Sequence, residues 1–487
     1  MDESARALNK TTALMKKKSC ILRSAFTLTF IGLISLLSAQ NRIFAGNNSE
    51  LFSAISKAKA GDTVVLKNGE WKNVNIDFNP DAKPGLPVTL QAQTPGKVTL
   101  SGNSSLVFSK PHLIVTGLVF KNGKLNDGSV VSFNSDHCRL TNSAIIDYNP
   151  DNFQTGYYWI YFKGSYNRID HCLLRGKSNM NPVLGNDNEN ARYNKADSCY
   201  IKDIPYLPKT NGREIFRIWG YGHDDQTGDD GAYFSIEYNL FEHADGEGTE
   251  IVSLKSNHNV VKFNTVIASK GGLVGRRGKD NTFEGNIILG EGVKGTTGIR
   301  VAGADHKVIN NYIADVTEDG LRLIAGEFYD KNLTGDFAKK KKSLPKYLQV
   351  ENCYFANNLI ADCGRNGIDI GYSYKNDWPE LQMVLLPQNN QFVKNLIYNC
   401  RGYSVNIVKQ DSLKPLNIFH FKPNTFSGNI VYGKSTCNTA IPVGIKVQNP
   451  DLKTGKDGMY RFDFKNNTNL TPLKPENVGP EWIKKCK

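Results

Sequence analysis

Short runs of apolar and polar residues, each ended by glycine, asparagine or aspartate, recur along most of the chain. Residues 61–69 give an early example, in which three apolar residues from Val64 to Leu66 are followed by an asparagine and a glycine. Runs of this length that end in turn residues predict short β-strands joined by tight turns. The pattern therefore indicates an all-β protein built from many short strands.

Three of these runs align with one another. Asn259 and Asn281 are 22 residues apart, as are Asn264 and Asn286, and Asn311 follows 25 residues later. A period in the low to middle twenties is typical of a parallel β-helix, whose coils bury a shared core by stacking. Asparagine tolerates the left-handed backbone conformation, and stacked asparagine side chains can hydrogen-bond from coil to coil. We predict a right-handed parallel β-helix, with a β-sandwich or propeller as the alternative.

The two ends of the chain depart from the repeat. After the capping residues Asn48 and Ser49, the apolar residues Leu51, Phe52 and Ile55 share one helical stripe. We predict that this short N-terminal helix covers the exposed end of the solenoid. The repeat fades after residue 440. The predicted organisation is a signal peptide and leader at 1–45, a β-helix domain at 46–440 and a C-terminal capping segment at 441–487.

Residues 1–45 have the layout of a secretory signal peptide. Lys16, Lys17, Lys18 and Arg23 precede an uncharged, mostly apolar run at residues 25–39, and small and polar residues follow it. A membrane anchor is the alternative, but the run is short for a bilayer span. We expect a secreted or periplasmic protein whose mature chain has no membrane span.

Composition and charge narrow the classes of partner. The formal net charge is +13, and because residues 1–45 hold seven basic and two acidic residues, the rest keeps +8. Such an excess favours an anionic partner. The sequence has no zinc-finger spacing, RNP-like motif or long basic helix, so nucleic acid is not expected as a partner. The nine cysteines form no CxxC pair, which argues against a zinc site. We expect a monomer that binds an anionic polysaccharide.

Residues that could carry out a reaction cluster in the middle of the repeat. Glu247, Glu250 and Lys255 are followed, about one coil later, by Arg276 and Arg277. Stacked coils lie about 4.8 Å apart, which places Lys255 next to the arginine pair. In β-elimination a base takes the proton beside a uronate carboxylate, a cation absorbs the developing charge, and a donor serves the leaving oxygen. Neighbouring cations favour a neutral lysine, and calcium would absorb charge on the uronate. A ladder of surface ion pairs is the alternative.

These motifs resemble polysaccharide lyase family six, which contains alginate lyases and enzymes of the chondroitinase B type. The family pattern has an Asn-Gly-x-Glu segment, an acidic cluster leading to Lys-Ser, and Arg-His-Gly about one coil later. The similar segments here are residues 211–214, 245–256 and 276–278. Lys255 and Arg276 are 21 residues apart, which matches the spacing between base and acid in the family. The resemblance implies a β-helical lyase acting on an acidic polysaccharide.

The resemblance also implies a role for each site residue. Lys255 would remove the C5 proton. Arg276 would serve the leaving oxygen, where stabilising negative charge is easier for a guanidinium than giving up a proton. The other implied roles are calcium ligands (Asn211, Glu247 and Glu250) and substrate contacts (Arg277 and Arg300). For Arg300, an outward charge on a strand is the alternative.

Two positions depart from the family pattern. Glu247 and Glu250 are three residues apart instead of two. In a flat strand they would point to opposite faces, so calcium binding by both requires a bulge. Arg277 stands where the family has histidine. Counted by the 22-residue asparagine ladder, Arg277 stacks on Lys255, whereas the family pattern favours Arg276, and both alternatives stay open.

We expect the protein to cleave alginate by β-elimination and to leave unsaturated uronate ends, since alginate cleavage is the commoner activity in the family that it resembles. Dermatan or chondroitin sulfate is the alternative substrate, and a non-catalytic glycan-binding β-helix is the alternative function. A hydrolase on the same fold would need clustered aspartates, which the sequence lacks near Lys255. The aromatic run at residues 157–161 fits either stacking on sugar rings or packing in the sheet.

Overall fold

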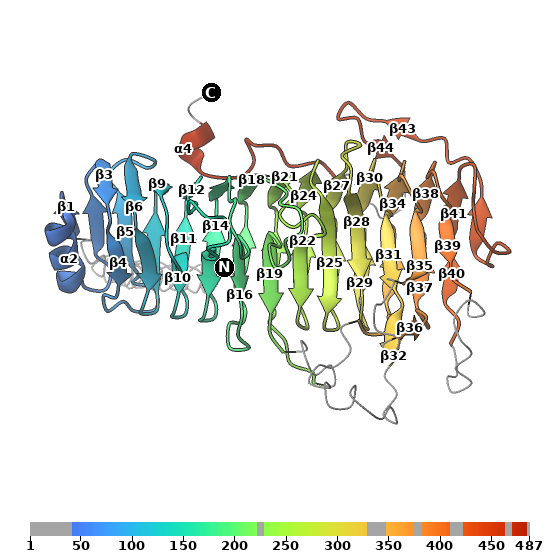
Figure 1. Cartoon of the computed structure of the whole chain (residues 1–487), viewed down its shortest axis with the longest axis horizontal. Coiled ribbons are helices and arrows are strands. Elements are labelled where there is room, and N and C mark those ends of the chain that lie inside the picture. Colours follow the sequence, from blue (N-terminus) through green and yellow to red (C-terminus); the bar gives the residue numbers. More distant parts are fainter. Residues whose placement is uncertain are drawn as a thin grey trace, which may run out of the picture.

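The computed structural model describes residues 41–221, 228–328, 347–373, 382–409, 422–462 and 470–484. In these residues three long parallel sheets, here called A, B and C, form the faces of an elongated solenoid (Figure 1). Each coil of the chain contributes one strand to each sheet in turn, and equivalent strands of consecutive coils pair in parallel. The predicted parallel β-helix is confirmed. Residues 1–40, which hold most of the predicted signal peptide, lie outside the described residues.

Sheets A and B each have 14 strands within the described residues. The strands of sheet A are β1 (Arg42–Ala45), β2 (Thr63–Leu66), β5 (Val88–Ala92), β8 (Leu113–Thr116), β11 (Arg139–Thr141), β14 (Arg168–Asp170), β17 (Lys195–Asp197), β20 (Ser235–Glu237), β23 (Val260–Lys262), β26 (Thr282–Glu284), β29 (Lys307–Ile309), β33 (Tyr354–Ala356), β37 (Gln391–Val393) and β40 (Thr425–Ser427). The strands of sheet B are β3 (Gly69–Lys72), β6 (Val98–Gly102), β9 (Leu118–Gly123), β12 (Ala144–Ile146), β15 (Leu173–Arg175), β18 (Tyr200–Ile204), β21 (Leu240–Ala244), β24 (Thr265–Ile267), β27 (Ile287–Leu289), β30 (Tyr312–Ala314), β34 (Leu359–Ala361), β38 (Leu396–Tyr398), β41 (Asn429–Tyr432) and β42 (Ile445–Val447).

Sheet C, which carries the predicted site, has 12 strands in the same part of the chain. They are β4 (Asn75–Phe78), β7 (Ser105–Phe108), β10 (Ser129–Phe133), β13 (Tyr158–Phe162), β16 (Leu184–Asn186), β19 (Phe216–Trp219), β22 (Glu250–Lys255), β25 (Gly271–Arg277), β28 (Thr296–Val301), β31 (Leu321–Ile324), β35 (Ile368–Tyr372) and β39 (Val405–Ile407). Two small antiparallel pairs complete the strands: β32 (Gly326–Phe328) with β36 (Gln382–Leu385), and β43 (Lys453–Thr454) with β44 (Tyr460–Arg461).

One hydrophobic core runs through the interior from Ala45 to Val431. Because parallel pairing places equivalent residues of successive coils above one another, inward side chains form columns. The rings of Phe108, Phe133 and Phe162 stack in this way, with centroids 4.6 and 4.8 Å apart. These columns leave the outward side chains of sheet C in matching rows, on which the site is built.

The predicted asparagine spacings form ladders at two corners: Asn259 donates to Asn281 at 2.9 Å between sheets C and A, and Asn264, Asn286 and Asn311 stack between sheets A and B. Seven buried asparagines form the ladder between sheets A and B, and the side-chain amides of the first six each donate to the Oδ1 of the next at 2.9 or 3.0 Å: Asn239, Asn264, Asn286, Asn311, Asn358, Asn395 and Asn429. Each amide also bonds the backbone, so these buried polar groups are satisfied. The ladder therefore holds each coil in register with the coil before it.

The two ends are covered differently. Helix α2 (Asn48–Lys57) buries Leu51, Ala54 and Ile55 against the first coil, which confirms the capping helix. Phe52 of the predicted stripe is instead exposed, and the N-cap is Asn47, one residue before the predicted capping residues. We expected residues 441–487 to cap the far end, and β42 does add a last strand there. The chain then returns along sheet B to helix α4 (Glu481–Lys484), where the indole of Trp482 donates to the carbonyl of Asn142 at 2.9 Å (Figure 1). The described residues of this tail contact sheet B, where the N–H of Tyr460 donates to the hydroxyl of Tyr312 and the N–H of Leu473 to that of Thr265, each at 2.9 Å.

Within the described ranges, no helix is both long enough and apolar enough to cross a membrane.

Candidate active site

The predicted site residues come together on the outer face of sheet C, where β19, β22, β25 and β28 lie on successive coils. Lys255 ends β22, Arg276 and Arg277 end β25, and Arg300 lies in β28. The two acidic residues lie at the opposite end of β22, since Glu250 begins the strand and Glu247 lies in the turn before it. Sequence segments a coil apart thus meet across one strip of the sheet.

The register between β22 and β25 shifts at two places. Glu250 pairs with Gly272 and Val252 with Leu273, so β22 carries one extra residue there. Near the other end, Leu254 pairs with Gly275 and Lys255 with Arg277, which leaves Arg276 as the extra residue of β25. The backbone partner of Lys255 is therefore Arg277, as the count along the ladder indicated. The shift also means that both arginine side chains are partly exposed, where strict alternation would bury one.

Two glycines allow β25 to lie close to its neighbours at the acidic end. Gly271 has φ of 89°, and a Cβ there would meet the backbone of Thr249 at 2.7 Å. A Cβ on Gly272 would lie 2.2 Å from the carbonyl oxygen of Gly298 on the following coil. Neither position accepts a side chain without displacement of backbone. The glycine pair in the sequence therefore serves the close packing of β25 beside Glu250.

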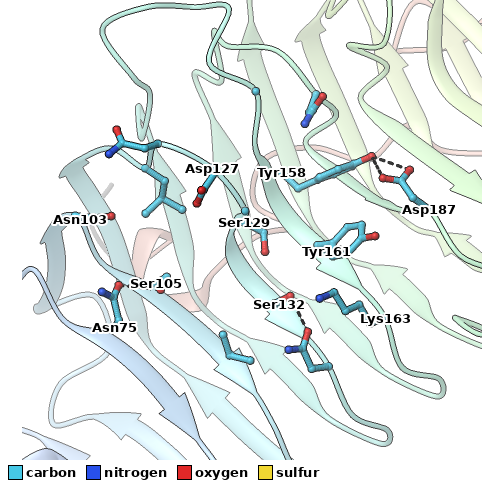
Figure 2. A pocket seen from close by; sticks show the side chains of 17 residues that line it. Asn75, Asn103, Ser105, Asp127, Ser129, Ser132, Tyr158, Tyr161, Lys163 and Asp187 are labelled. Carbon is cyan, nitrogen blue, oxygen red and sulfur yellow. Dashed lines mark hydrogen bonds between the residues drawn. The ribbon is translucent and has the colours of Figure 1, made fainter.

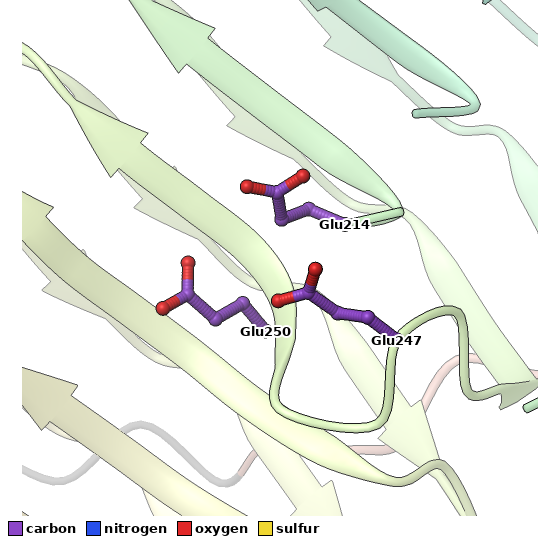
Figure 3. A group of neighbouring side chains, drawn as sticks. All are labelled: Glu214, Glu247 and Glu250. Atoms are coloured by element: carbon purple, nitrogen blue, oxygen red, sulfur yellow. The ribbon is translucent and has the colours of Figure 1, made fainter. Parts of the chain in front are cut away.

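Three glutamates form a buried acidic cluster (Figure 3). The carboxylates of Glu214, Glu247 and Glu250 offer oxygens that all lie within 4.8 Å of one another. Glu247 accepts hydrogen bonds from the backbone N–H of Gly212 at 2.8 Å and from the hydroxyl of Thr249 at 2.7 Å. Burial raises the pKa of Glu247, and the neighbouring Glu214 and Glu250 raise it further. Because Glu247 precedes the strand, alternation along β22 does not separate it from Glu250.

Lys255 lies beside this cluster. Its Nζ donates to Oε1 of Glu214 at 2.7 Å and lies 5.3 Å from the centre of the Trp219 ring. Its side chain keeps 16% of its surface exposed, whereas that of Glu214 keeps 3%. The amine is thus oriented by a buried carboxylate and an aromatic face and remains reachable from outside.

Arginines from the next two coils surround Glu250. Arg300 hydrogen-bonds its carboxylate directly, and the Nε of Arg276 lies 3.6 Å from the same oxygen. The guanidinium of Arg276 also lies 3.8 Å from the ring centre of Tyr347. Burial would raise the pKa of Glu250, but Arg300, Arg276 and Lys255 outweigh it and hold the pKa below its ordinary value. Glu250 is therefore an ionised carboxylate that holds two arginines on the face.

Sequence reasoning missed two residues of the site. Glu214 belongs to the segment quoted for the resemblance, but Asn211 was chosen there as the ligand. The structure leaves Asn211 exposed and brings Glu214 into the cluster. Arg217 pairs with Glu214 at 3.5 Å and, on its other side, with Asp187 at 3.2 Å. Arg217 stands out in the sequence as a charged residue between apolar neighbours in β19, one coil before Ser253.

The acidic cluster has the donor chemistry of a calcium site. Calcium takes six to eight oxygen ligands, and charged carboxylates are its common protein donors. Glu214, Glu247 and Glu250 supply such oxygens from two coils, close enough to converge on one ion. The residues present therefore fit calcium in donor type and spacing.

The family model described as Chondroitinase B matches residues 45–461. A PL6 family polysaccharide lyase from Pseudopedobacter saltans superposes with a TM-score of 0.78 at 44% identity, over 90% of this chain and 99% of that chain. The PL6 family alginate lyase AlyGC gives a TM-score of 0.77 at 26% identity, over 91% of this chain and 58% of that chain.

A third solved structure is a mannuronic acid specific polysaccharide family 6 lyase from human gut microbiota. It gives a TM-score of 0.69 at 26% identity, over 85% of this chain and 92% of that chain. A search of the curated proteins found no match. The matched residues 45–461 include every strand that carries the acidic cluster, Lys255 and the arginines.

Proposed function

Because the chain belongs to the chondroitinase B family and is a polysaccharide lyase, we propose that it cleaves alginate by β-elimination, with Lys255 as the base. One observation carries this proposal. The amine of Lys255 lies 2.7 Å from a buried carboxylate, on the same outer strip of sheet C as Arg276 and Arg300. A partly exposed amine on a strip that also carries guanidinium groups suits proton abstraction next to a uronate carboxylate.

The proposed reaction assigns a part to each group. Lys255, in its neutral form, takes the proton from C5 of the uronate. The electron pair of the broken C5–H bond forms the C4–C5 double bond, and the C4–O bond to the neighbouring sugar breaks. Arg276 stabilises the negative charge on the leaving oxygen, which takes a proton from water. The proton held by Lys255 then neutralises the remaining hydroxide.

The residues around Lys255 hold the substrate for this step. Arg277 lies one coil beyond Lys255 and Arg300 lies two coils beyond it, and their charges suit the carboxylates of a polyuronate. Glu214 orients the amine of Lys255 through their 2.7 Å contact. The base is thereby aimed at the outer face, where the sugar ring has to lie.

We also propose calcium as a cofactor, held by Glu247 and Glu250 as the resemblance implies and by Glu214 as the geometry adds. Bound there, calcium would absorb negative charge on the uronate carboxylate. Asn211 remains a proposed fourth ligand. A chelator should lower turnover at least about tenfold, and calcium should restore it, since such charge stabilisation amounts to several kcal/mol. Full activity after chelation, with no calcium bound by calorimetry, would contradict the cofactor.

We propose alginate as the first candidate substrate because of the activities that the similar solved structures are described as having. AlyGC is described as an alginate lyase and the gut enzyme as mannuronic acid specific, and each is 26% identical to this chain. Dermatan sulfate is the second candidate, because the matching family model is described as Chondroitinase B. Export to the periplasm or the medium is part of the proposal, supported by the signal-like layout of residues 1–45.

The test is a substrate panel. Purified protein is mixed with alginate, polymannuronate, polyguluronate and dermatan sulfate, and ultraviolet absorbance reports unsaturated ends. We expect a rise with alginate and with at least one of its homopolymers. A rise with dermatan sulfate alone would select the second candidate, and no rise with any of the four would contradict the proposed function.

A further inference from the structure

A second feature of sheet C lies toward the N-terminal end of the solenoid. A cavity of about 780 Å³ opens on the outer face over β4, β7, β10 and β13 (Figure 2). All of its lining residues lie within residues 75–187, and the cavity meets the site described above at Asp187, which pairs with Arg217. Its volume is in the range of sites that hold a small-molecule ligand or a few sugar units.

The lining is chemically unlike the catalytic cluster. It consists mainly of side-chain amides and hydroxyls, among them Asn75, Asn103, Ser105, Ser132, Asn134 and Asn181. Lys163 is the one basic residue among its lining residues, and Asp127 and Asp187 are acidic. Neutral groups that both donate and accept hydrogen bonds suit sugar hydroxyls, whereas two acids and one lysine offer little net attraction to carboxylates.

Two tyrosines give the cavity an aromatic wall. The rings of Tyr158 and Tyr161 lie 4.9 Å apart, and the amine of Lys163 lies 6.0 Å from the ring centre of Tyr161. Tyr158 is buried, but Tyr161 is half-buried in the outward row of β13. Of the aromatic run at residues 157–161, Tyr157 and Trp159 belong to the core. Tyr161 therefore supplies a partly open aromatic ring, and such a ring suits the apolar face of a sugar.

The cavity is linked to the catalytic face by a chain of side-chain contacts. The hydroxyl of Tyr158 bonds Asp187 at 2.8 Å and also contacts Arg217, which pairs with Glu214, the partner of Lys255. Along the outward row, Tyr161 pairs with Gly185 and Gly185 with Arg217. Gly185 places no side chain in the row between the aromatic wall and Arg217. With coils about 4.8 Å apart, Tyr161 lies three coils, or roughly 14 Å, from Lys255.

We propose that this cavity is a distal subsite of the same lyase, which binds units of the polysaccharide chain several sugars away from the bond that is cleaved. It holds them by their hydroxyls and by one ring face on Tyr161, and relies on carboxylate recognition less than the cluster around Lys255 does. This inference rests on the proposed function. Its consequence is a preference for substrates long enough to reach from Lys255 to Tyr161.

The experiment compares Tyr161→Ala with the wild type on long alginate and on the shortest oligosaccharide that the wild type cleaves. We expect the ratio of kcat/KM for long over short substrate to fall about tenfold, which corresponds to the loss of one aromatic contact of about 1.4 kcal/mol. Tyr166→Ala is the matched control, since Tyr166 is a half-exposed tyrosine close in sequence but outside the cavity. That variant should keep the wild-type ratio.

A binding measurement separates the two proposals. Oligosaccharides of increasing length are titrated calorimetrically into Lys255→Ala, with and without Tyr161→Ala. Tighter binding of long oligosaccharides that disappears with Tyr161→Ala supports the subsite, even if the wild type cleaves none of the substrates. If the wild type cleaves alginate, but Tyr161→Ala changes neither the ratio nor the length dependence of binding, the subsite is wrong and the proposed function stands.

Discussion

Two sets of buried polar side chains stack from coil to coil in this solenoid, and they differ in nearly every other respect. The asparagine ladder joins seven identical amides at 2.9 or 3.0 Å in unbroken register. The cluster on sheet C joins three carboxylates with Lys255 and arginines across strands whose register shifts twice. The ladder is neutral and repeats one residue type, whereas the cluster combines acidic and basic side chains.

The difference shows how a repeat protein makes a site. A neutral amide that hydrogen-bonds the equivalent asparagine one coil later needs no other side chain to satisfy its hydrogen-bonding groups. Buried carboxylates need cations supplied from other coils, and desolvation opposes their burial. Such groups therefore lie where the regular register breaks, at the bulges beside Glu250 and Arg276. Substitutions in the cluster should reduce turnover, whereas a substitution in the ladder should reduce stability alone, and the expected losses of turnover run from large to small.

Lys255→Ala should have the largest effect. Removal of a general base lowers turnover by about 10² to 10⁴-fold, so we expect a loss of roughly 10³-fold in the release of unsaturated ends. Circular dichroism should stay unchanged, because Lys255 is on the outer face. The control is Lys262→Ala, which removes a lysine paired with Glu284 at 3.1 Å on sheet A and should keep wild-type turnover. Turnover above a tenth of the wild-type rate would remove Lys255 from the mechanism.

Glu250→Gln should reduce both turnover and stability. The change leaves Arg300 and Arg276 facing a neutral amide in a site where Glu250 is 6% exposed. Breaking one partner of a buried ion pair costs about 3 to 5 kcal/mol, so a clear fall in Tm is expected. Turnover should fall about 10²-fold as the arginines lose their position. Glu284→Gln, in a more exposed pair, serves as the control, and equal Tm values for the two variants would contradict this account.

Arg276→Ala and Arg277→Ala should differ. Arg276 contacts Glu250 at 3.6 Å and lies over Tyr347, which fixes its guanidinium beside the acidic cluster. We expect Arg276→Ala to lower kcat about 10²-fold, as the loss of an oxyanion-type donor does, and Arg277→Ala to raise KM with a smaller change in kcat. Steady-state kinetics on alginate measures kcat and KM for both variants. The reverse order would make Arg277, the backbone partner of Lys255, the residue that serves the leaving oxygen.

Asn286→Ala should leave turnover within about twofold of the wild type and lower stability. It interrupts the ladder between Asn264 and Asn311 and leaves buried donors and acceptors unsatisfied. Each unsatisfied buried group costs about 1 to 3 kcal/mol, which thermal unfolding would detect. A loss of turnover at a temperature where the variant is folded would show that the ladder also supports the site, and the contrast between the two sets would then fail.

Much of the fold was predictable from the sequence because its signals are local. Alternating runs set the strands, turn residues end them, and the asparagine spacing identifies the coil period. The same spacing placed Lys255 opposite Arg277, which the strand register confirms. Glu214 and Arg217 were missed because loops of unequal length separate the coils: Glu214 is 41 residues from Lys255, although their side chains are 2.7 Å apart.

The sequence by itself thus determined a parallel β-helix, the asparagine ladder, and a strip where lysine and arginines meet. Only the tertiary structure decided which carboxylates join that strip, which side of the strand each arginine takes, and that the described residues of the C-terminal tail contact sheet B. The physical reason is that stacking in register follows from a repeated local pattern, whereas a register shift or a long loop changes which side chains meet without leaving a periodic trace.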